Sequence, residues 1–325
     1  MDGPTACWRA LEVVPRTGST NGDLVARARA GEDAGLVLLA DDQVAGRGRL
    51  TRVWAVPPRS SIAVSVLLRP EVDRARWGWI ALLTGLAVVD ALGAVCGLDA
   101  RLKWPNDVLL TLDPSSGTGS DSGPRSDSGT SSGSGSSLRS GSDDGEGSPE
   151  SGVPGGIGRR PDTRASADTW GPAEREFKVA GILAEVVAVG AATAVVVGTG
   201  INVSQRADEL PVPTATSLAL AGARTTDRDT VARAFLRSLA ARLARWQDAD
   251  GDPARCGLWQ DYGAACVTVG RSVQVHLPGG RRVDGTAEGV DEDGCLQVRD
   301  TNGVLHHLAA GDVVHVRPGT AGDLA

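Results

Sequence analysis

The chain has 325 residues, of which 41% are hydrophobic, and carries a formal net charge of −7. This length predicts two domains, and the acidic balance excludes a protein whose main task is to bind nucleic acid. Its five cysteines are odd in number and contain no C-x-x-C pair, which excludes a disulfide framework or a thiolate zinc site. The N-terminal residues include acids and lack a long apolar run, so no signal peptide is predicted and we expect a cytoplasmic protein.

The first third of the chain predicts a loop, a short helix and two strands. Residues 18–31 form a loop leading into a helix, because Ser, Thr and Asn near its start favour N-caps and Gly31 favours a C-cap. Apolar runs predict buried strands at 36–40 and 61–68. The basic, glycine-containing loop 41–54 lies between them.

Residues 77–98 are apolar over a length that could cross a bilayer, and Asp90 is their only charge. Four glycines and that internal aspartate weigh against a membrane span. We interpret the stretch as a buried core helix and expect no membrane partner.

The middle of the chain predicts a hairpin, then a change of composition. Residues 101–110 indicate strand, turn and strand, because Pro-Asn-Asp favours a tight turn. Residues 113–176 are mostly Ser, Gly, Asp, Pro and Arg, too poor in aliphatic side chains to offset the entropy of ordering. We expect this segment to be a disordered insertion.

The last part of the chain predicts strands, a helix and a second small domain. Two β-rich runs between 177 and 203 flank a turn at 190–192, and apolar residues recur at helical spacing over 227–246. Short alternating runs with glycine-containing turns over 267–325 predict a small β-barrel.

The distribution of histidines limits the chemistry. All four follow residue 266, so an active site in the larger domain has no histidine for Ser-His-Asp or Cys-His catalysis. Such a site would have to use Arg, Lys, Asp and backbone amides, which suit phosphate chemistry.

Three features carry possible chemistry, and each has a simpler interpretation. The loop from Gly46 to Arg52 could bind an anion with its arginines, or could be a solvated basic loop. The stretch from Lys103 to Asp107 could present functional groups on a rigid turn, or could be only a hairpin turn. Lys178 beside an apolar run could reach an anion, or could extend to water from a strand end.

Taken together and in order, these motifs resemble the biotin–protein ligase family. The resemblance runs from about residue 17 to the end, apart from the insertion, and GRGRLTRVW with KWPND is its most specific part. The related lipoate–protein ligases have a different arginine–glycine loop and a histidine-containing motif that this sequence lacks. The matching segments are G-S-T-N (18–21), Gln43, GRGRLTRVW (46–54), KWPND (103–107), KVAGIL (178–183), GTGINV (198–203) and ATSL (215–218).

The resemblance implies an α+β fold with two domains. A class II aminoacyl-tRNA-synthetase-like catalytic domain, with a mixed sheet flanked by helices, would span residues 1–266 and be interrupted at 113–176. An SH3-like barrel with a short tail would span 267–325. Only about sixteen residues precede the first motif, so the resemblance is to the short form without an N-terminal DNA-binding domain, and we expect no nucleic-acid partner.

The implied activity is activation of biotin with ATP and Mg²⁺ to biotinyl-adenylate, followed by transfer to a lysine of a biotin carboxyl carrier domain of an acyl-CoA carboxylase. Lys178, Arg49 and Asp107 would be catalytic, with no metal held by protein side chains. Biotin would bind Ser19, Thr20, Asn21, Gln43, Arg47, Gly48, Arg49 and Lys178, and ATP or the adenylate would bind Arg49, Arg52, Trp54, Lys103, Asn106 and Asn202.

Two other functions remain open at this point: a lipoate or other acyl–protein ligase on the same scaffold, and a non-catalytic biotin-responsive regulator. The oligomeric state, monomer or weak homodimer, is also open. Since the family has a short turn in place of the insertion, we expect the insertion to be dispensable.

Overall fold

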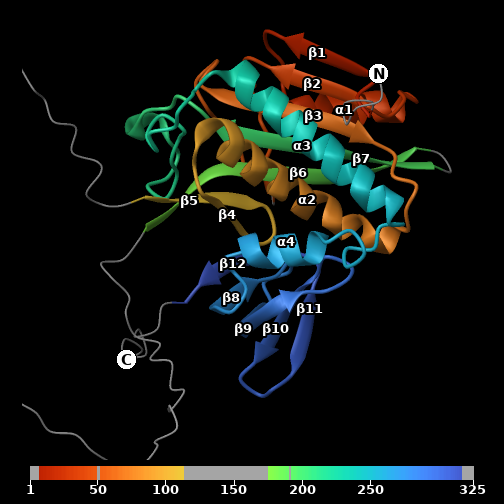
Figure 1. Ribbon diagram of the computed structural model, residues 1–325, viewed down its shortest axis with the longest axis vertical. Coiled ribbons are helices and arrows are strands. Elements are labelled where there is room, and N and C mark those ends of the chain that lie inside the picture. The colour runs from red at the N-terminus through yellow and green to blue at the C-terminus, as the bar shows by residue number, and fades with distance from the viewer. Residues whose placement is uncertain (1–6, 50–51, 113–174, 190–191, 317–325) are drawn as a thin grey trace, which may run out of the picture. The chain divides into compact units, whose positions relative to one another are not determined.

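The computed structural model describes residues 7–49, 52–112, 175–189 and 192–316. Seven strands form one mixed sheet in the order β1-β2-β3-β7-β6-β5-β4 (Figure 1). β1 and β2 are parallel, and all other neighbours in this sheet are antiparallel. The strands are β1 (Ala10–Val14), β2 (Leu36–Ala40), β3 (Ser61–Leu68), β4 (Ala100–Lys103), β5 (Asp107–Leu112), β6 (Arg175–Val189) and β7 (Ala192–Asn202).

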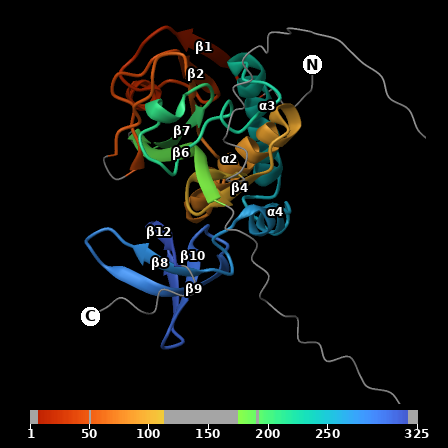
Figure 2. The ribbon, with the colours of Figure 1, turned by 90° about the vertical axis from the view of Figure 1, so that its left-hand side faces the viewer.

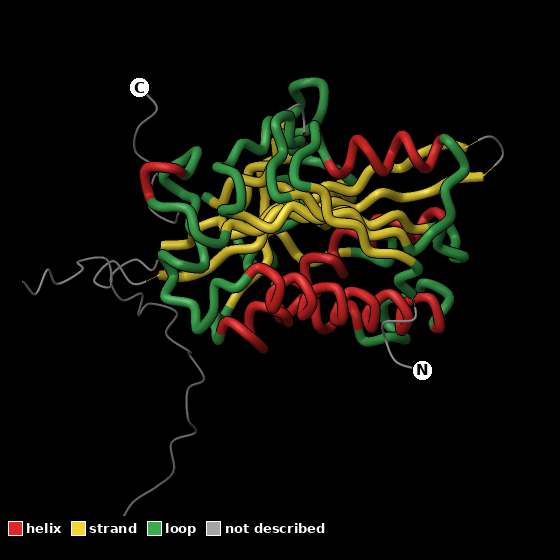
Figure 3. The backbone as a smooth tube through the Cα atoms, turned by 90° about the horizontal axis from the view of Figure 1, so that it is seen from above, coloured by secondary structure: helices red, strands yellow, loops and turns green. Residues whose placement is uncertain are grey.

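Helices cover both faces of this sheet, as Figure 3 shows. Side chains alternate between the two faces along each strand, so Leu36 and Leu38 pack with Leu24 of α1, whereas Val37 joins the larger core with α2 and α3. Burial on both faces explains the almost wholly apolar sequence of β3. The helices are α1 (Thr20–Arg29), α2 (Gly78–Ala91) with a π-helical turn (Leu92–Cys96), α3 (Arg228–Asp248) and α4 (Leu258–Ala265).

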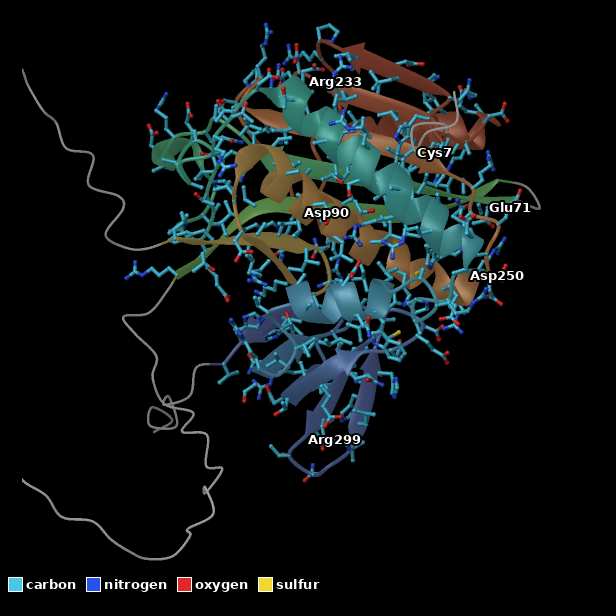
Figure 4. The ribbon with its side chains drawn as sticks, in the orientation of Figure 1. Cys7, Glu71, Asp90, Arg233, Asp250 and Arg299 are labelled. Atoms are coloured by element: carbon cyan, nitrogen blue, oxygen red, sulfur yellow. The ribbon has the colours of Figure 1, made fainter. Side chains whose placement is uncertain are left out.

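The apolar stretch predicted to be a core helix is α2. The helical segment Arg74–Cys96 is long and apolar enough to cross a membrane by length and composition, with a mean hydropathy of 2.0. However, 67% of its most apolar window is buried inside the fold. Asp90, labelled in Figure 4, accepts hydrogen bonds at 2.6 and 2.9 Å from Arg242 of α3. The prediction of a buried core helix is confirmed.

Most predicted elements are confirmed, but two strands and one α-helix of the described residues were not predicted. The strands at 36–40 and 61–68, both hairpins and the helix after residue 227 form as expected. β1, α4 and β9 (Arg282–Val290) were not predicted. β9 escaped detection because Asp, Glu and two glycines dilute its alternation, although Val283, Ala287 and Val290 are buried.

The predicted end of the insertion is wrong by two residues. Arg175 and Glu176 belong to β6, where they pair with Leu112 and Thr111 of β5. Glu176 is held there because it accepts hydrogen bonds from Arg271 at 2.5 and 3.1 Å. Residues 113–174, the rest of the predicted insertion, lie outside the described residues.

The C-terminal region forms a second, five-stranded antiparallel sheet, blue in Figure 2. Its strand order is β11-β10-β9-β8-β12. The indoles of Trp79 and Trp104 donate to the backbone carbonyls of Glu292 and Gly294, at 2.9 and 3.3 Å, and join this sheet to the helices and hairpin above it. The remaining strands are β8 (Ser272–His276), β10 (Leu296–Asp300), β11 (Leu305–Leu308) and β12 (Asp312–His315).

Candidate active site

A cavity of about 520 Å³ lies where the first turn of α1 meets the central strands. This volume is in the range of pockets that bind cofactor-sized molecules. Every residue predicted for the site except Lys103 lines it. These are Ser19, Thr20, Asn21, Gln43, Arg47, Gly48, Arg49, Arg52, Trp54, Asn106, Asp107, Lys178 and Asn202.

The cavity is hollow because β7 changes side-chain size along one face. Ala194 and Val196 pack in the core beneath α1, but the next residues in this alternation are Gly198 and Gly200. A Cβ atom at Gly198 would collide with the side chain of Asn21. At Gly200 it would lie 2.6 Å from Cε2 of the Trp54 indole. The two glycines of the GTGIN motif therefore make room for ligand and for Trp54.

One end of the cavity is a recess of neutral hydrogen-bonding groups. The backbone N–H and Oγ1 of Thr20 donate to Oε1 of Gln43 at 2.8 and 3.1 Å. Thr20 Oγ1 also lies 2.7 Å from Ser65 Oγ, which donates to Asn21 Oδ1 at 2.6 Å. Asn21 in turn donates to Glu185 at 2.9 Å. The hydroxyls and amides are thus held in one network before any ligand binds.

The other end holds charged groups around Trp54. Lys178 Nζ lies 2.5 Å from Asp107 Oδ1 and 5.8 Å from the centre of the Trp54 ring. The Trp54 indole N–H is buried and has no hydrogen-bond partner among the described residues. A lysine, a carboxylate and an aromatic face are therefore within reach of one ligand.

The three arginines of the glycine loop are all engaged by groups of the protein. Arg47 pairs with Glu185 at 3.2 Å, and Arg52 pairs with Asp312 of β12. Arg49 donates to Oδ1 of Asn106 at 3.1 Å and to a backbone carbonyl at 3.3 Å, and burial lowers its pKa. Carboxylates and carbonyls thus occupy the positions that an anionic ligand would compete for.

Two predicted residues differ from the rest in their placement. Asn202 lines the cavity, but its amide donates to the Thr216 carbonyl at 2.9 Å and accepts from Gln205 at 3.1 Å, so its side chain is already fixed. Lys103 lies opposite Asp107 in the β4–β5 pairing and does not line the cavity.

Sequence reasoning missed Ser65, Glu185 and Gln205. Ser65 is a hydroxyl inside the apolar run SIAVSVLL, and Glu185 is a lone carboxylate on an apolar strand, so both had a signal that could have been used. Gln205 had none, because only the folded chain buries it beside Asn202.

The arrangement suits an acid with a polar head that reacts with a phosphate. None of the four histidines is among the described residues that line the cavity, which leaves cations and one carboxylate as the reactive groups. Cations in a partly desolvated cavity stabilise charge that develops between two anions.

Two family models match the chain: the "Biotin/lipoate A/B protein ligase family" over residues 13–122, and the "Biotin protein ligase C terminal domain" over residues 268–316. The biotin–[acetyl-CoA-carboxylase] ligase of Mycobacterium tuberculosis is 37% identical, over 97% of this chain and 92% of its own. The bifunctional ligase/repressor BirA of Bacillus spizizenii is 25% identical over 83% of this chain, which spans 63% of that protein.

The fold has the same relatives. A biotin protein ligase from Aquifex aeolicus, solved in complex with biotin and ATP, superposes with a TM-score of 0.62. It is 22% identical, and the match covers 95% of this chain and all of that one. With the motifs gathered in one cavity and a full-length relative at 37% identity, the chain belongs to the biotin–protein ligase family.

Proposed function

We propose that this chain is a biotin–protein ligase. It would join biotin to ATP as biotinyl-5′-AMP with release of pyrophosphate, then transfer biotin to a lysine of a biotin carboxyl carrier protein. The observation that carries the proposal is the single cavity, which has a neutral hydrogen-bonding recess at one end and Lys178, Arg49 and Asp107 at the other. The name of the Mycobacterium tuberculosis relative, which is matched over nearly its whole length, supports the same activity.

The neutral recess would hold the ureido head of biotin. A urea offers one carbonyl acceptor and two N–H donors, which match the hydroxyls and amides of Ser19, Thr20, Asn21 and Gln43. Since these groups are already ordered by the network through Ser65, binding would need little reorganisation. Ala63, Val64 and Ile182 among the lining residues would contact the apolar part of the vitamin.

In the first step the biotin carboxylate attacks the α-phosphate, which brings two anions together. Lys178, Arg47 and Arg49 would neutralise this charge, each contact contributing about 1.5–3 kcal/mol in a desolvated site. The adenine would pack on Trp54, while Arg52 and Asn106 complete the nucleotide contacts. Mg²⁺ would accompany ATP and would offset the phosphate charge as pyrophosphate leaves.

In the second step the acceptor lysine attacks the biotinyl carbonyl, a C–N bond forms and AMP leaves. The amine must lose a proton, and we propose that Asp107, which lines the cavity, would accept it. Glycine-loop closure over the adenylate would keep water from the mixed anhydride.

The proposed function extends to the folds of the two domains, the acceptor protein and the cell compartment. We propose a class II synthetase-like catalytic domain over residues 1–266 and an SH3-like barrel over 267–325. The acceptor would be the carrier domain of a carboxylase, in line with the name of the Mycobacterium tuberculosis relative. Five unpaired cysteines are compatible with a reducing cytoplasm.

Mass spectrometry of a biotin carrier domain incubated with the protein and MgATP tests the proposal. Biotin should add one biotinyl group, whereas lipoate in its place should add nothing. Lys178→Ala and Arg49→Ala should abolish biotin-dependent ATP–pyrophosphate exchange while leaving the circular dichroism spectrum unchanged. Binding of biotin without any exchange would favour a non-catalytic regulator, and modification by lipoate would favour the other ligase class.

A further inference from the structure

Lysine is almost absent from this chain, and the two lysines it has share one location. Of 33 basic residues only Lys103 and Lys178 are lysines, while 31 are arginines. Both lie beside Asp107: Lys178 pairs with its carboxylate at 2.5 Å, and Lys103 is its partner in the β4–β5 register. The two lysines of the chain therefore lie on the strands that flank the strand of Asp107.

Lys103 is partly buried and forms no ion pair or side-chain hydrogen bond with any described residue. Four charged groups affect its pKa: Asp107 of β5, Glu176 and Lys178 of β6, and Asp312 of β12. Desolvation lowers the pKa of Lys103, and the charge of Asp107 opposes that effect. Among these charged neighbours, Asp107 has the largest effect on the pKa of Lys103.

The proposed function, on which this inference rests, moves Lys178 away from Asp107. Lys178 cannot neutralise the biotin carboxylate and α-phosphate and keep its full pairing with Asp107. The charge of Arg49 also acts on Asp107, but in the proposed function Arg49 binds the same anions as Lys178. A partly buried carboxylate that loses these counter-charges is driven toward protonation. Once protonated, Asp107 could not accept the proton of the acceptor lysine.

We infer that Lys103 is a positioning residue that holds Asp107 ionised while Lys178 is bound to the substrate anion. Lys103 acts from outside the cavity, through Asp107, and contacts neither biotin nor nucleotide. The ammonium shifts from an unpaired state to pairing with Asp107 when Lys178 leaves.

Half-reactions measured separately test this role. Lys103→Met keeps the stem and removes the charge, and its ATP–pyrophosphate exchange should lose less activity than its transfer reaction and keep the pH dependence of the parent. The rate of single-turnover transfer from preformed biotinyl-adenylate to a carrier domain should be measured against pH. On the acid side of this pH–rate profile the variant should lose activity, and the acid limb should move to higher pH by about one pH unit. Lys103→Arg, which keeps the charge, should leave that limb in place. Arg101→Met, on the same strand but paired with Asp99, is the matched control and should change neither reaction.

Loss of exchange and transfer together at every pH, with no shift of the limb, would overturn the inference. A parent protein without biotin-dependent exchange would instead overturn the proposed function.

Amine labelling gives a second readout on the parent protein, because only two lysine side chains and the N-terminus can react. A sulfamoyl analogue of biotinyl-adenylate should protect Lys178 from acetylation by an N-hydroxysuccinimide ester and should also lower the reactivity of Lys103. In Asp107→Asn the analogue should no longer lower the reactivity of Lys103. If the analogue protects Lys103 equally in that variant, Lys103 contacts the ligand directly and the inference is wrong.

Discussion

At the scale of single residues, the cavity depends as much on missing side chains as on present ones. Trp54 packs against β7 at a point where Gly200 has no Cβ atom, and Asn21 does so at Gly198. The indole and the amide can approach the sheet only because these positions are glycine. The contacts of Trp54 therefore offer a way to separate nucleotide binding from biotin binding.

Gly200→Ala should weaken nucleotide binding. The new methyl group would meet the Trp54 ring at 2.6 Å and displace the surface proposed for adenine. We expect the KM for ATP in the exchange reaction to rise about tenfold, equivalent to about 1.4 kcal/mol, with biotin affinity within about twofold. Gly263→Ala on α4, where a Cβ meets open space, is the control. An unchanged KM for Gly200→Ala would contradict the placement of adenine.

At the scale of elements, α2 has to carry a charge through an otherwise apolar packing surface. Asp90 accepts two hydrogen bonds from the guanidinium of Arg242 of α3. Arg242 also pairs with Asp261 of α4 at 2.9 Å. Arg242 is only 14% exposed, so its charge depends on these carboxylates. The pair fixes how the two helices meet.

Asp90→Ala should lower the free energy of unfolding by about 1–2 kcal/mol, because Arg242 keeps only one of its partners. Urea unfolding followed by circular dichroism measures this change. Asp229→Ala removes the exposed partner of Arg233 on the same helix and should move the midpoint far less. If the two substitutions lower the free energy of unfolding equally, the burial of Arg242 does not increase the contribution of its ion pair to stability.

The pairing of β5 with β6 predicts how the insertion can be replaced. Leu112 and Arg175 lie opposite each other, and residues in that relation can be joined by a two-residue turn. Replacing residues 113–174 with Asn-Gly should leave the melting temperature unchanged and the rate of biotin-dependent exchange within about twofold of the parent value. The same turn in place of residues 113–176 also removes Glu176, and should lower the melting temperature. Loss of soluble protein with the first replacement would mean that the segment is needed for folding.

At the scale of the whole molecule, side chains of the C-terminal region contact the glycine loop and the strand that carries Lys178. Asp312 pairs with Arg52 of the glycine loop, and Arg271 with Glu176, two residues before Lys178. The nearby His315 and Arg271 lower the pKa of Glu176 from 4.5 to about 2, and the Arg271 contacts are the shorter. The C-terminal sheet therefore restrains the strand that carries Lys178.

A pH dependence follows from the lowered pKa of Glu176. A carboxylate whose pKa falls on folding adds stability above its unfolded value, and that stability is lost as pH falls toward the folded value. Glu176→Gln should cost about 1 kcal/mol at pH 7, after allowance for the partial exposure of Arg271, and the difference should shrink between about pH 4.5 and pH 2. Urea titrations of both proteins at pH 7 and pH 3 measure it.

The control is Glu288→Gln, which removes an exposed partner of Arg299 in the same sheet and should change stability much less. If Glu176→Gln destabilises the protein equally at pH 7 and pH 3, the ionised carboxylate is not the stabilising species.

Periodicity and motif order were sufficient to predict the strands 36–40 and 61–68, the core helix and most of the polar and charged side chains that line the cavity. Local patterns succeed there because each of these features depends on residues that are close together in the sequence. This holds for the apolar runs of strands buried on both faces, for turn residues and for the KWPND and GRGR motifs. They failed for β9, whose glycines weaken the alternation, and for the end of the insertion at Glu176, which is held by a side chain almost a hundred positions later.

Only the tertiary structure decided the partners of the charged groups. Nothing in the sequence indicates that Arg52 meets Asp312, that Arg47 meets Glu185 or that Lys103 lies outside the cavity beside Asp107. Such contacts depend on strand register and on elements distant in the chain, whereas the chemistry of each residue is local. The residue types therefore determined which reaction is possible, and their spatial arrangement determined which groups can take part in it.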